Sequence, residues 1–401
     1  MAPDPTGPST RAVHSGHLEN EYGAVSSPIY QSATFRFPTL AAMLEAFHAG
    51  PAGMVYTRYN NPTIAALETG LAATEGAEAA LSFASGMAAI TSALLAFLQP
   101  GDRILAQREI YGGTFEFLNA WAPRLGFHVD WFSLRDIDGI DALLAAKPRI
   151  VYAETPTNPL LRVVDLEWLA AQAHAAGALL MVDNTFATGV LQRPLALGAD
   201  VVVHSATKYL GGHSDVVAGA AMGSAVRMHA VWKVRKVFGG CIDPQAAWLL
   251  ERSLQTLPLR LERACANARA IATHLAAHRF VERVHWPGLP THPDHALAKT
   301  QMKDFGAMMS IELGGDLAAA ARFVDHLKLF QLAASLGGTG SLVSVPVASS
   351  HFALTPAERA EAGVTEGMVR LSVGIEDAAD LIADLDQALA HASAGAETAR
   401  A

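Results

Sequence analysis

Short apolar runs alternate with helical patterns between about residues 60 and 255, and this alternation restricts the fold more than any other feature of the chain. Seven runs are rich in β-branched and other apolar residues: 80–83, 103–106, 127–132, 149–153, 179–182, 201–204 and 216–221. Helical patterns lie between them, for example at 87–98, 138–146 and 165–176. Continuous apolar strands separated by helices are typical of a parallel sheet covered on both faces. We therefore predict an α/β domain with a mostly parallel, seven-stranded sheet.

The rest of the chain follows other patterns, and 401 residues are more than one ordinary hydrophobic core needs. Residues 1–60 have little periodicity and several prolines, which predicts an extended N-terminal arm. After a long helical pattern at 258–278, strand patterns at 308–313, 342–345 and 369–372 mix with helices. We therefore predict three parts: the arm (1–60), a ligand-binding domain (61–255) and a smaller C-terminal α+β domain (256–401).

The composition narrows the class of protein. It is 51% hydrophobic and 17% charged, which is typical of a well-buried globular chain. The net charge of −9 and the lack of a dense Lys/Arg block argue against nucleic acid or an anionic membrane as a partner. Cys241 and Cys265 have no metal-binding spacing, and no apolar run approaches the roughly 20 residues that span a bilayer. Because the first ten residues also lack a signal-peptide core, we expect a cytoplasmic protein with reduced thiols and no metal site.

Two charged side chains follow two of the predicted strands, at the ends where α/β sheets bind ligands. Asp183 follows strand 179–182, and Lys208 follows strand 201–204. Alone, the aspartate is explained as a helix cap or turn residue and the lysine as a solvated surface group. Together they provide what pyridoxal phosphate (PLP) requires: an amine for a Schiff base and an acid for the ring nitrogen. A charge pair at about 4 Å contributes roughly 4 kcal/mol at an effective dielectric near 20, enough to keep that nitrogen protonated.

PLP also needs a phosphate anchor, and the segment 82–87 follows a strand and opens a helix. Its small residues, Gly86 among them, let backbone N–H groups approach an anion at the helix N-terminus. Ser205 and Thr207 add hydroxyl groups from the loop that carries Lys208. Small residues also mark ordinary strand-to-helix turns, so the segment is not decisive alone. The competing P-loop, dinucleotide-binding, GxSxG and HExxH motifs are absent from the sequence.

Eight motifs now stand in a recognisable order. The chain resembles the trans-sulfuration family (cystathionine and methionine metabolism) of PLP-dependent enzymes, of the aspartate-aminotransferase fold type I. The motifs that carry the resemblance are 56–63, 85–87, 111–114, 154–159, 182–185, 205–209, 335–338 and 369–372. The resemblance covers essentially the whole chain after about residue 10. It implies a homotetramer built from dimers, with active sites shared across each dimer.

The resemblance also implies a role for each site residue. Lys208 is expected to hold PLP and then to move protons among the substrate carbons, while Asp183 pairs with the pyridine nitrogen. Tyr111 is expected to stack on the ring and to assist as an acid or base. Asn158 is expected to contact the phenolic oxygen of the cofactor. The expected phosphate ligands are Gly86, Met87, Ser205 and Thr207, together with Tyr56 and Arg58 from a neighbouring subunit.

The same resemblance assigns Arg370 to the α-carboxylate of the substrate, with Ser335 close by. A guanidinium meets a carboxylate with two parallel hydrogen bonds, which an ammonium cannot do. For Arg58 and Arg370, the alternative is a surface salt bridge. His204 and His213 flank the expected site, and we expect most histidines to be solvated or packed.

Members of this family remove or replace a substituent at Cγ or Cβ of an amino acid. We expect γ-elimination or γ-replacement, as in the cystathionine γ-lyases and γ-synthases that segment 238–244 resembles. The alternatives are an O-acylhomoserine sulfhydrylase, a methionine γ-lyase, or a γ-lyase with a non-thiol leaving group in specialised metabolism. Gly113 stands where methionine γ-lyases usually have Cys, which makes that activity less favoured. Gly340 stands where the family commonly has Glu, so the resemblance implies a smaller or less polar distal group on the substrate.

Two readings from other classes remain open. An aminotransferase of the same fold would share Asp183 and Lys208 but has no need of Tyr56 and Arg58 in this form. A non-enzymatic scaffold would be expected to lose the lysine or the aspartate, and both are present.

Overall fold

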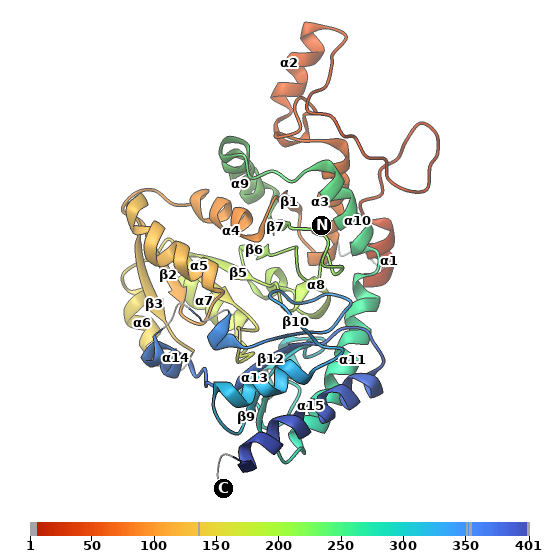
Figure 1. The fold of residues 1–401 in the computed structure, drawn as a ribbon. Helices are drawn as coiled ribbons and strands as arrows, with labels where there is room; N and C mark the ends of the chain where they lie inside the picture. Colours follow the sequence, from red (N-terminus) through yellow and green to blue (C-terminus); the bar gives the residue numbers. More distant parts are fainter. Residues whose placement is uncertain (1–5, 135–136, 350–351, 353–354, 399–401) are drawn as a thin grey trace. The chain divides into compact units, whose positions relative to one another are not determined.

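The structure, a computed structural model, describes residues 6–134, 137–349, 352 and 355–398 (Figure 1). The chain forms two compact units. Unit 1 comprises the residues up to Gln107, Glu116–Ala153 and Leu166–Pro258. Unit 2 comprises Arg108–Phe115, Glu154–Asp165 and the residues from Leu259 onward. None of the helices in the described ranges is long and apolar enough to cross a membrane.

Unit 1 is built on a seven-stranded sheet, as the apolar runs predict. Its strands are β1 (Ala79–Phe83), β2 (Arg103–Gln107), β3 (His128–Phe132), β4 (Ile150–Glu154), β5 (Leu179–Asp183), β6 (Val201–His204) and β7 (Gly219–Gly223). The strand order is β1-β7-β6-β5-β4-β2-β3. β4 and β6 are buried along their whole length, which explains their continuous apolar sequences.

One strand of this sheet reverses the common direction. β7 pairs antiparallel with both β1 and β6, whereas β2–β3, β2–β4 and β5–β6 are parallel pairs. The mostly parallel α/β sheet is therefore confirmed. The last run, expected at 216–221, forms its strand three residues later, at Gly219–Gly223. There the backbone of Gly219 packs closely against that of Ser85. A Cβ on Gly219 would lie only 2.1 Å from the carbonyl oxygen of Ser85, so a larger residue would not fit.

The helices of unit 1 begin where the sequence provides capping side chains. The hydroxyl of Ser85 accepts the backbone N–H of Ala88 at the start of α4, and the carboxylate of Asp243 caps α10 in the same way. α4 packs on β6 and β7, and α7 packs on β5. The main helices are α1 (Pro8–His14), α2 (Leu40–His48), α3 (Pro62–Glu75), α4 (Gly86–Leu95), α6 (Ile140–Leu144), α7 (Leu166–Ala175), α8 (Thr188–Leu191), α9 (Ala225–Phe238) and α10 (Pro244–Leu254).

Unit 2 contains a five-stranded sheet in the order β10-β11-β12-β9-β8. Its strands are β8 (Val281–His285), β9 (Met308–Leu313), β10 (Gln331–Leu332), β11 (Leu342–Ser344) and β12 (Met368–Ser372). Its helices are α5 (Gly112–Glu116), α11 (Leu257–Ala276), α12 (His295–Gln301), α13 (Leu317–His326), α14 (Pro356–Ala362) and α15 (Ala378–Thr398). α5 and α11 cross the boundary with unit 1 by one or two residues. α13 and α15 pack against each other.

The two units do not have the same boundaries along the chain as the three segments predicted from the sequence. The arm, expected at 1–60, groups with unit 1, and α2 extends away from the seven-stranded sheet (Figure 1). Segments 108–115 and 154–165, which lie inside the expected ligand-binding domain, group with unit 2. Both segments carry residues of the expected site, which is therefore divided between the units.

Candidate active site

The central expected residues follow two adjacent parallel strands of unit 1. Asp183 ends β5 and is paired in register with Val203 of β6. Lys208 lies four residues beyond the end of β6, in a turn in which its backbone N–H donates to the carbonyl of Ser205 at 3.1 Å. Because parallel strands end at the same edge of a sheet, the carboxylate and the amine come from adjacent strand ends.

A hydroxyl group connects the two loops. Thr185 Oγ1 donates to Asp183 Oδ1 at 2.5 Å and accepts the backbone N–H of Ser205 at 2.9 Å. The backbone N–H of Thr185 donates to the same carboxylate oxygen at 3.0 Å. The carboxylate is thus oriented by two donors of its own loop, the hydroxyl and the N–H of Thr185, and the same hydroxyl links it to the start of the lysine loop.

The other oxygen of Asp183 is left for a ligand. Oδ2 receives only the hydroxyl of Tyr152, at a long 3.5 Å. Among the described residues, no Lys or Arg forms an ion pair with Asp183, although its side chain is buried. Burial raises the pKa of Asp183, and the hydrogen bonds from Thr185 and the charge of His204 act in the opposite direction. A cation at Oδ2 would offset the cost of burying this carboxylate.

A second buried network lies behind the same two strands. His204 Nε2 is 3.0 Å from Glu75 Oε2, and both side chains are about 1% exposed. The other oxygen of Glu75 accepts from Asn184 Nδ2 at 3.0 Å. His204 Nδ1 has no hydrogen-bond partner in the described part of the chain. Asn184, which follows Asp183, and His204, which precedes the lysine loop, are therefore both held by the buried carboxylate of Glu75. His204 is a packed histidine, like most histidines in our expectation.

The expected phosphate anchor meets the lysine loop directly. A Cβ on Gly86 would lie 2.9 Å from Ser205 Cβ and 3.0 Å from its Oγ, so only glycine fits against this hydroxyl. Gly86 and Met87 open α4, whose first N–H groups have no partner inside the helix. The hydroxyl of Thr207 donates to the carbonyl of Ala218 and accepts the N–H of the same residue, and its expected contact with the phosphate stays a prediction. Thr207 ties the lysine loop to the segment before β7.

Tyr56 and Arg58 lie on the arm, and their observed contacts are local. The side chain of Tyr56 is 41% exposed. Arg58 donates to the carbonyl of Lys236 and lies over the rings of Tyr56 and Tyr59, at 5.5 and 5.0 Å from their centroids. This arrangement leaves the tyrosine ring accessible on the surface of unit 1.

The residues expected to bind the substrate come together within unit 2. Arg370, in the middle of β12, donates from Nη1 to Asn158 Oδ1 at 2.9 Å and from Nη2 to the carbonyl of Ser335 at 3.2 Å. Its side chain is buried. Ser335 has a φ of +90°, a conformation that non-glycine residues rarely adopt. Such backbone is maintained where the surroundings fix it, as the guanidinium does here.

Tyr111 is also in unit 2. It precedes α5, and its backbone N–H donates to Glu154 Oε2 at 2.7 Å. Glu154 is buried, whereas the ring of Tyr111 is 49% exposed. The backbone is thus fixed while the ring remains available for stacking.

Comparison with known proteins decides the family. Residues 9–390 match the family model described as Cys/Met metabolism PLP-dependent enzyme. The chain belongs to this family. An L-methionine γ-lyase of Fusobacterium nucleatum subsp. nucleatum is 44% identical over 96% of this chain and 98% of its own length. A cystathionine γ-lyase of Bacillus subtilis is 43% identical over 95% and 98%. Among solved structures, the cystathionine γ-synthase of Xanthomonas oryzae pv. oryzae superposes with a TM-score of 0.92 at 42% identity, covering 98% of this chain and 100% of that one.

As a member of the Cys/Met metabolism family, the chain is a PLP-dependent lyase-type enzyme of fold type I, and its residues fit that cofactor. The buried carboxylate of Asp183 has one oxygen available for a protonated ring nitrogen. Gly86 approaches Ser205 closely, so the start of α4 and the lysine loop, both expected to bind the phosphate, lie side by side. Lys208 follows Ser205 on the loop after β6, and the hydroxyl of Thr185 links the start of this loop to Asp183.

Three side chains with clear structural roles were not predicted: Thr185, Tyr152 and Glu75. Thr185 stands inside a recognised motif (182–185), so its position was marked although its role was not. In the sequence, Tyr152 lies in a pattern typical of an apolar strand, and Glu75 resembles an ordinary acidic residue at the end of a helix. No sequence signal distinguishes Glu75 from a solvated surface carboxylate.

Proposed function

We propose that this enzyme eliminates or replaces the γ-substituent of an L-amino acid whose distal group is small and uncharged. The support for the first part is the family and its relatives, which carry the names methionine γ-lyase, cystathionine γ-lyase and cystathionine γ-synthase. The support for the second part is the loop between Ser335 and β11. Gly340 is exposed, and no atom lies within 4 Å of the position where its Cβ would stand. Residue 340 itself contributes no carboxylate for a distal ammonium group, and the neighbouring carboxylate of Glu376 already accepts the N–H and the hydroxyl of Ser341 at 2.6 and 3.0 Å.

When bound, PLP supplies a carbonyl that takes up the substrate amine and a ring that accepts the electron pair released at Cα. Lys208 Nζ then takes the Cα proton and delivers protons within the substrate. Asp183 Oδ2 keeps the proton on the ring nitrogen, and the ring of Tyr111 covers the cofactor. Arg370 binds the α-carboxylate through its planar fork.

The contacts of Arg370 support this proposed role. Its hydrogen bonds to Asn158 and to the carbonyl of Ser335 hold the guanidinium plane in one position. Preorganisation of this kind lowers the entropic cost of binding a carboxylate. The remaining N–H groups of Asn158 are suited to an oxygen of the cofactor.

Among the alternatives, a methionine γ-lyase, an O-acylhomoserine sulfhydrylase or transferase, and a γ-lyase with a non-thiol leaving group all use these residues. Gly113, which stands where methionine γ-lyases usually have Cys, makes methionine a less favoured substrate. The 44% sequence identity to a methionine γ-lyase favours it. An aminotransferase is disfavoured, because the family match covers residues 9–390 and the similar proteins are named lyases and synthases.

We also propose that the enzyme is a cytoplasmic homotetramer in which each dimer shares its active sites. The arm exposes large apolar side chains; Tyr22 is 87% exposed and Val25 is 93% exposed. Apolar side chains of this size gain free energy when another subunit covers them. Tyr56 and Arg58, on the same arm, would then reach the phosphate of the neighbouring subunit. Neither cysteine forms a disulfide, in keeping with a reducing compartment.

A product assay tests the proposed reaction. The PLP-loaded enzyme is given methionine, cystathionine, O-acetylhomoserine, O-succinylhomoserine and a γ-halogenated analogue, each with and without cysteine or sulfide, and the products are identified by mass spectrometry. Release of 2-oxobutyrate and ammonia without a thiol identifies a γ-lyase. A thioether or homocysteine formed only with a thiol identifies a γ-synthase or sulfhydrylase. A Lys208→Ala variant should have no turnover, and γ-elimination retained in it would overturn the assignment of Lys208.

A further inference from the structure

A buried carboxylate ties together the ends of the two strands that carry Asp183 and the lysine loop. Glu75 is the last residue of α3, and its Oε1 accepts from Asn184 Nδ2 at 3.0 Å while its Oε2 lies 3.0 Å from His204 Nε2. Asn184 follows β5, and His204 ends β6. One side chain therefore contacts both strand ends.

This network lies on the side of the strands away from Asp183. Side chains alternate along a strand, so Asn184 points to the face opposite that of Asp183. The backbone of Asn184 continues the ladder, because its N–H donates to the carbonyl of Val203 at 3.1 Å. Thr185 thus links Asp183 to the lysine loop on one face, and Glu75 links the neighbouring residues on the other.

The surroundings fix both members of the contact between Asn184 and Glu75. Asn184 Nδ2 also donates to the carbonyl of Gln192 at 2.9 Å, and its Oδ1 accepts from Gln192 Nε2 at 3.0 Å. A Cβ on Gly189 would lie 2.3 Å from the carbonyl oxygen of Thr74 and 2.8 Å from Glu75 Oε2, so only glycine fits where α8 meets the end of α3. The fold is therefore shaped closely around this carboxylate.

Stability alone does not explain a carboxylate at this position. Glu75 is about 1% exposed and stands at the C-terminal end of α3. A negative charge is unfavourable at that end of a helix, and a buried charge costs free energy unless it is paired. Apolar side chains of similar size often stabilise a protein as well as a buried ion pair does. The charge of Glu75 therefore needs a role beyond packing.

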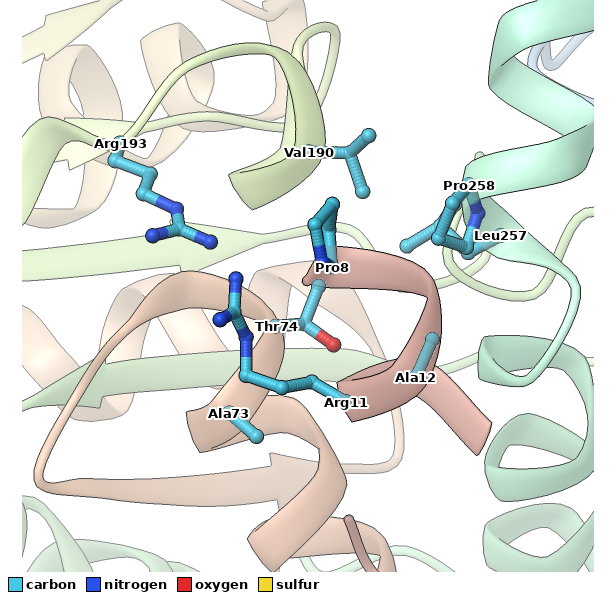
Figure 2. Close-up of a pocket in the computed structure, with 9 residues that line it drawn as sticks. All are labelled: Pro8, Arg11, Ala12, Ala73, Thr74, Val190, Arg193, Leu257 and Pro258. Carbon is cyan, nitrogen blue, oxygen red and sulfur yellow. The ribbon is translucent and has the colours of Figure 1, made fainter. Parts of the chain in front are cut away.

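The hydrogen-bond partner of Glu75 that can carry a positive charge is His204, which is also about 1% exposed. His204 Nδ1 has no hydrogen-bond partner in the described part of the chain, so its contact with Glu75 is the one that favours a proton on this ring. Arg193 lies within electrostatic range of Glu75, but no ion pair joins these two described residues. Figure 2 shows the guanidinium of Arg193 pointing toward that of Arg11 instead. The elements α4, α8 and β7, which pack against α3 or β6, carry no charged side chain.

His204 in turn acts on Asp183. Burial raises the pKa of Asp183, whereas the hydrogen bonds from Thr185 and Tyr152 and the charge of His204 lower it. A protonated ring nitrogen needs Asp183 in its carboxylate form. Glu75 favours the charged form of His204, and His204 favours the charged form of Asp183. The charges therefore alternate in sign from the end of α3 to the carboxylate that faces the cofactor.

We propose that Glu75 and His204 are positioning residues for PLP: Glu75 holds His204 and Asn184 behind the strand ends, and the charge of His204 keeps Asp183 in the form that pairs with the ring nitrogen. The proposal rests on the proposed contact between Asp183 and that nitrogen. It adds two buried side chains that act only through Asp183 and its strand.

The test measures the affinity for PLP by absorbance titration of the full chain, after removal of PLP, at pH 6 and pH 8.5. Glu75→Gln keeps the size of the side chain and its hydrogen-bonding capacity but removes its charge. Asp200→Asn is the matched control, because this buried carboxylate also contacts a histidine, His174 at 2.9 Å, and lies at the opposite end of β5 and β6. Asp183→Asn tests the contact with the ring nitrogen by itself.

We expect Glu75→Gln to bind PLP about 10-fold more weakly than the wild type at pH 6, which is the size of effect that one neighbouring charge has on an ionisable group. The difference should be smaller at pH 8.5, because a higher pH favours the carboxylate of Asp183 in both proteins. His204→Gln removes the same charge and should show the same pH dependence. The double variant should lose little more than either single variant, since both changes break one pair. Asp200→Asn should lower the Tm but bind PLP like the wild type at both pH values.

Comparison with the wild type at each pH removes the effects of titration of PLP itself. Wild-type affinity in Glu75→Gln and His204→Gln at pH 6, together with weaker binding in Asp183→Asn, would overturn this proposal and leave the Asp183 contact in place. A loss of equal size at both pH values would also contradict it, because a purely structural role has no such pH dependence. Unchanged affinity in Asp183→Asn would remove the contact with the ring nitrogen and the proposal with it. If Glu75→Gln does not fold, His204→Gln provides the same comparison.

Discussion

The hydroxyl of Thr185 lies 2.5 Å from Asp183 Oδ1, and the same hydroxyl accepts the backbone N–H of Ser205. One side chain therefore sets both the orientation of the carboxylate and the position at which the lysine loop begins. Because Thr185 is buried, water cannot replace either hydrogen bond without rearrangement.

Replacing Thr185 with valine should weaken the active site without a change in side-chain shape. The variant loses a hydrogen bond to Asp183 and leaves the N–H of Ser205 unpaired, a cost of about 1–3 kcal/mol. We expect PLP to bind about 10-fold to 100-fold more weakly, with a parallel fall in kcat. Absorbance titration of the cofactor and steady-state kinetics measure both effects. Thr185→Ser keeps the hydroxyl and should stay near the wild type; a valine variant with unchanged PLP affinity would show that the bridge is unimportant.

Arg370→Lys should raise KM more than it lowers kcat. The lysine keeps the positive charge, but it cannot make the hydrogen bonds to Asn158 and Ser335 and also a bidentate contact with a carboxylate. We expect a KM increase of about 10-fold to 100-fold, from the loss of one charged hydrogen bond. Arg279→Lys, at an exposed position of unit 2, is the control. An unchanged KM in Arg370→Lys would exclude this arginine from carboxylate binding.

Gly340→Glu should shift substrate preference toward amino acids with a distal ammonium group, such as cystathionine. The structure accommodates a side chain here, since nothing lies within 4 Å of the Cβ position. The variant should therefore fold and bind PLP like the wild type. The ratio of kcat/KM for cystathionine to that for an uncharged substrate is the measurement. Gly340→Gln has the same size without the charge, so an equal shift in both variants, or none in either, would contradict the electrostatic explanation.

His292 should make unit 2 sensitive to mild acid. Its Nδ1 accepts the N–H of Asp294 at 3.2 Å, and its Nε2 lies 3.3 Å from the carbonyl oxygen of Leu160, so the neutral tautomer with the proton on Nε2 satisfies both contacts. Burial lowers the pKa of His292, and the charges of His285 and Arg162 lower it further. The hydrogen bond to the Leu160 carbonyl and the charge of Asp294 raise it, and the net shift is downward. A proton on Nδ1 would remove the acceptor that Asp294 uses.

Because the folded-state pKa lies below the unfolded value of about 6.5, the unfolded chain takes up this proton first as the pH falls. The contribution of His292 to stability is complete above about pH 6.5 and is lost below it, by at most about 1.4 kcal/mol per pH unit. Denaturant unfolding at pH 7.5, 6.5 and 5.5 measures the loss. His292→Gln should flatten this dependence, and His128→Gln, at an exposed position of β3, should not. Identical slopes in all three proteins would exclude His292 as the cause.

The sequence predicted most of the strands because they are largely apolar runs, whereas β8 (Val281–His285) and β10 (Gln331–Leu332) were not predicted. β6 and β9 begin and end at the predicted residues, and the other predicted strands are displaced by only one to three residues. The direction of β7 was not predictable, since apolar character is the same in parallel and antiparallel strands. The grouping of 108–115 and 154–165 with unit 2 depends on contacts distant in sequence, and no local pattern encodes those.

The motifs assigned roles to the expected site residues, and those roles stay predictions, whereas the side chains that hold these residues in place were not predicted. The contacts of Arg370 with Asn158 and Ser335 agree with the expected proximity of these residues. Thr185 and Glu75 act through the geometry of one hydroxyl and one buried carboxylate. The contacts of the Thr207 hydroxyl with the backbone of Ala218 were not predicted either, because they depend on how the lysine loop lies against the segment before β7.

The left-handed conformation of Ser335 has a consequence for how the substrate range of this enzyme can evolve. At that position, a β-branched or bulky residue costs stability, and glycine or asparagine is tolerated best. Gly340, five residues along the same loop, has neither a positive φ nor a close neighbour. A library of random substitutions should therefore be depleted at 335 and permissive at 340. New specificities should accumulate at the far end of the loop, while its beginning keeps Arg370 in place.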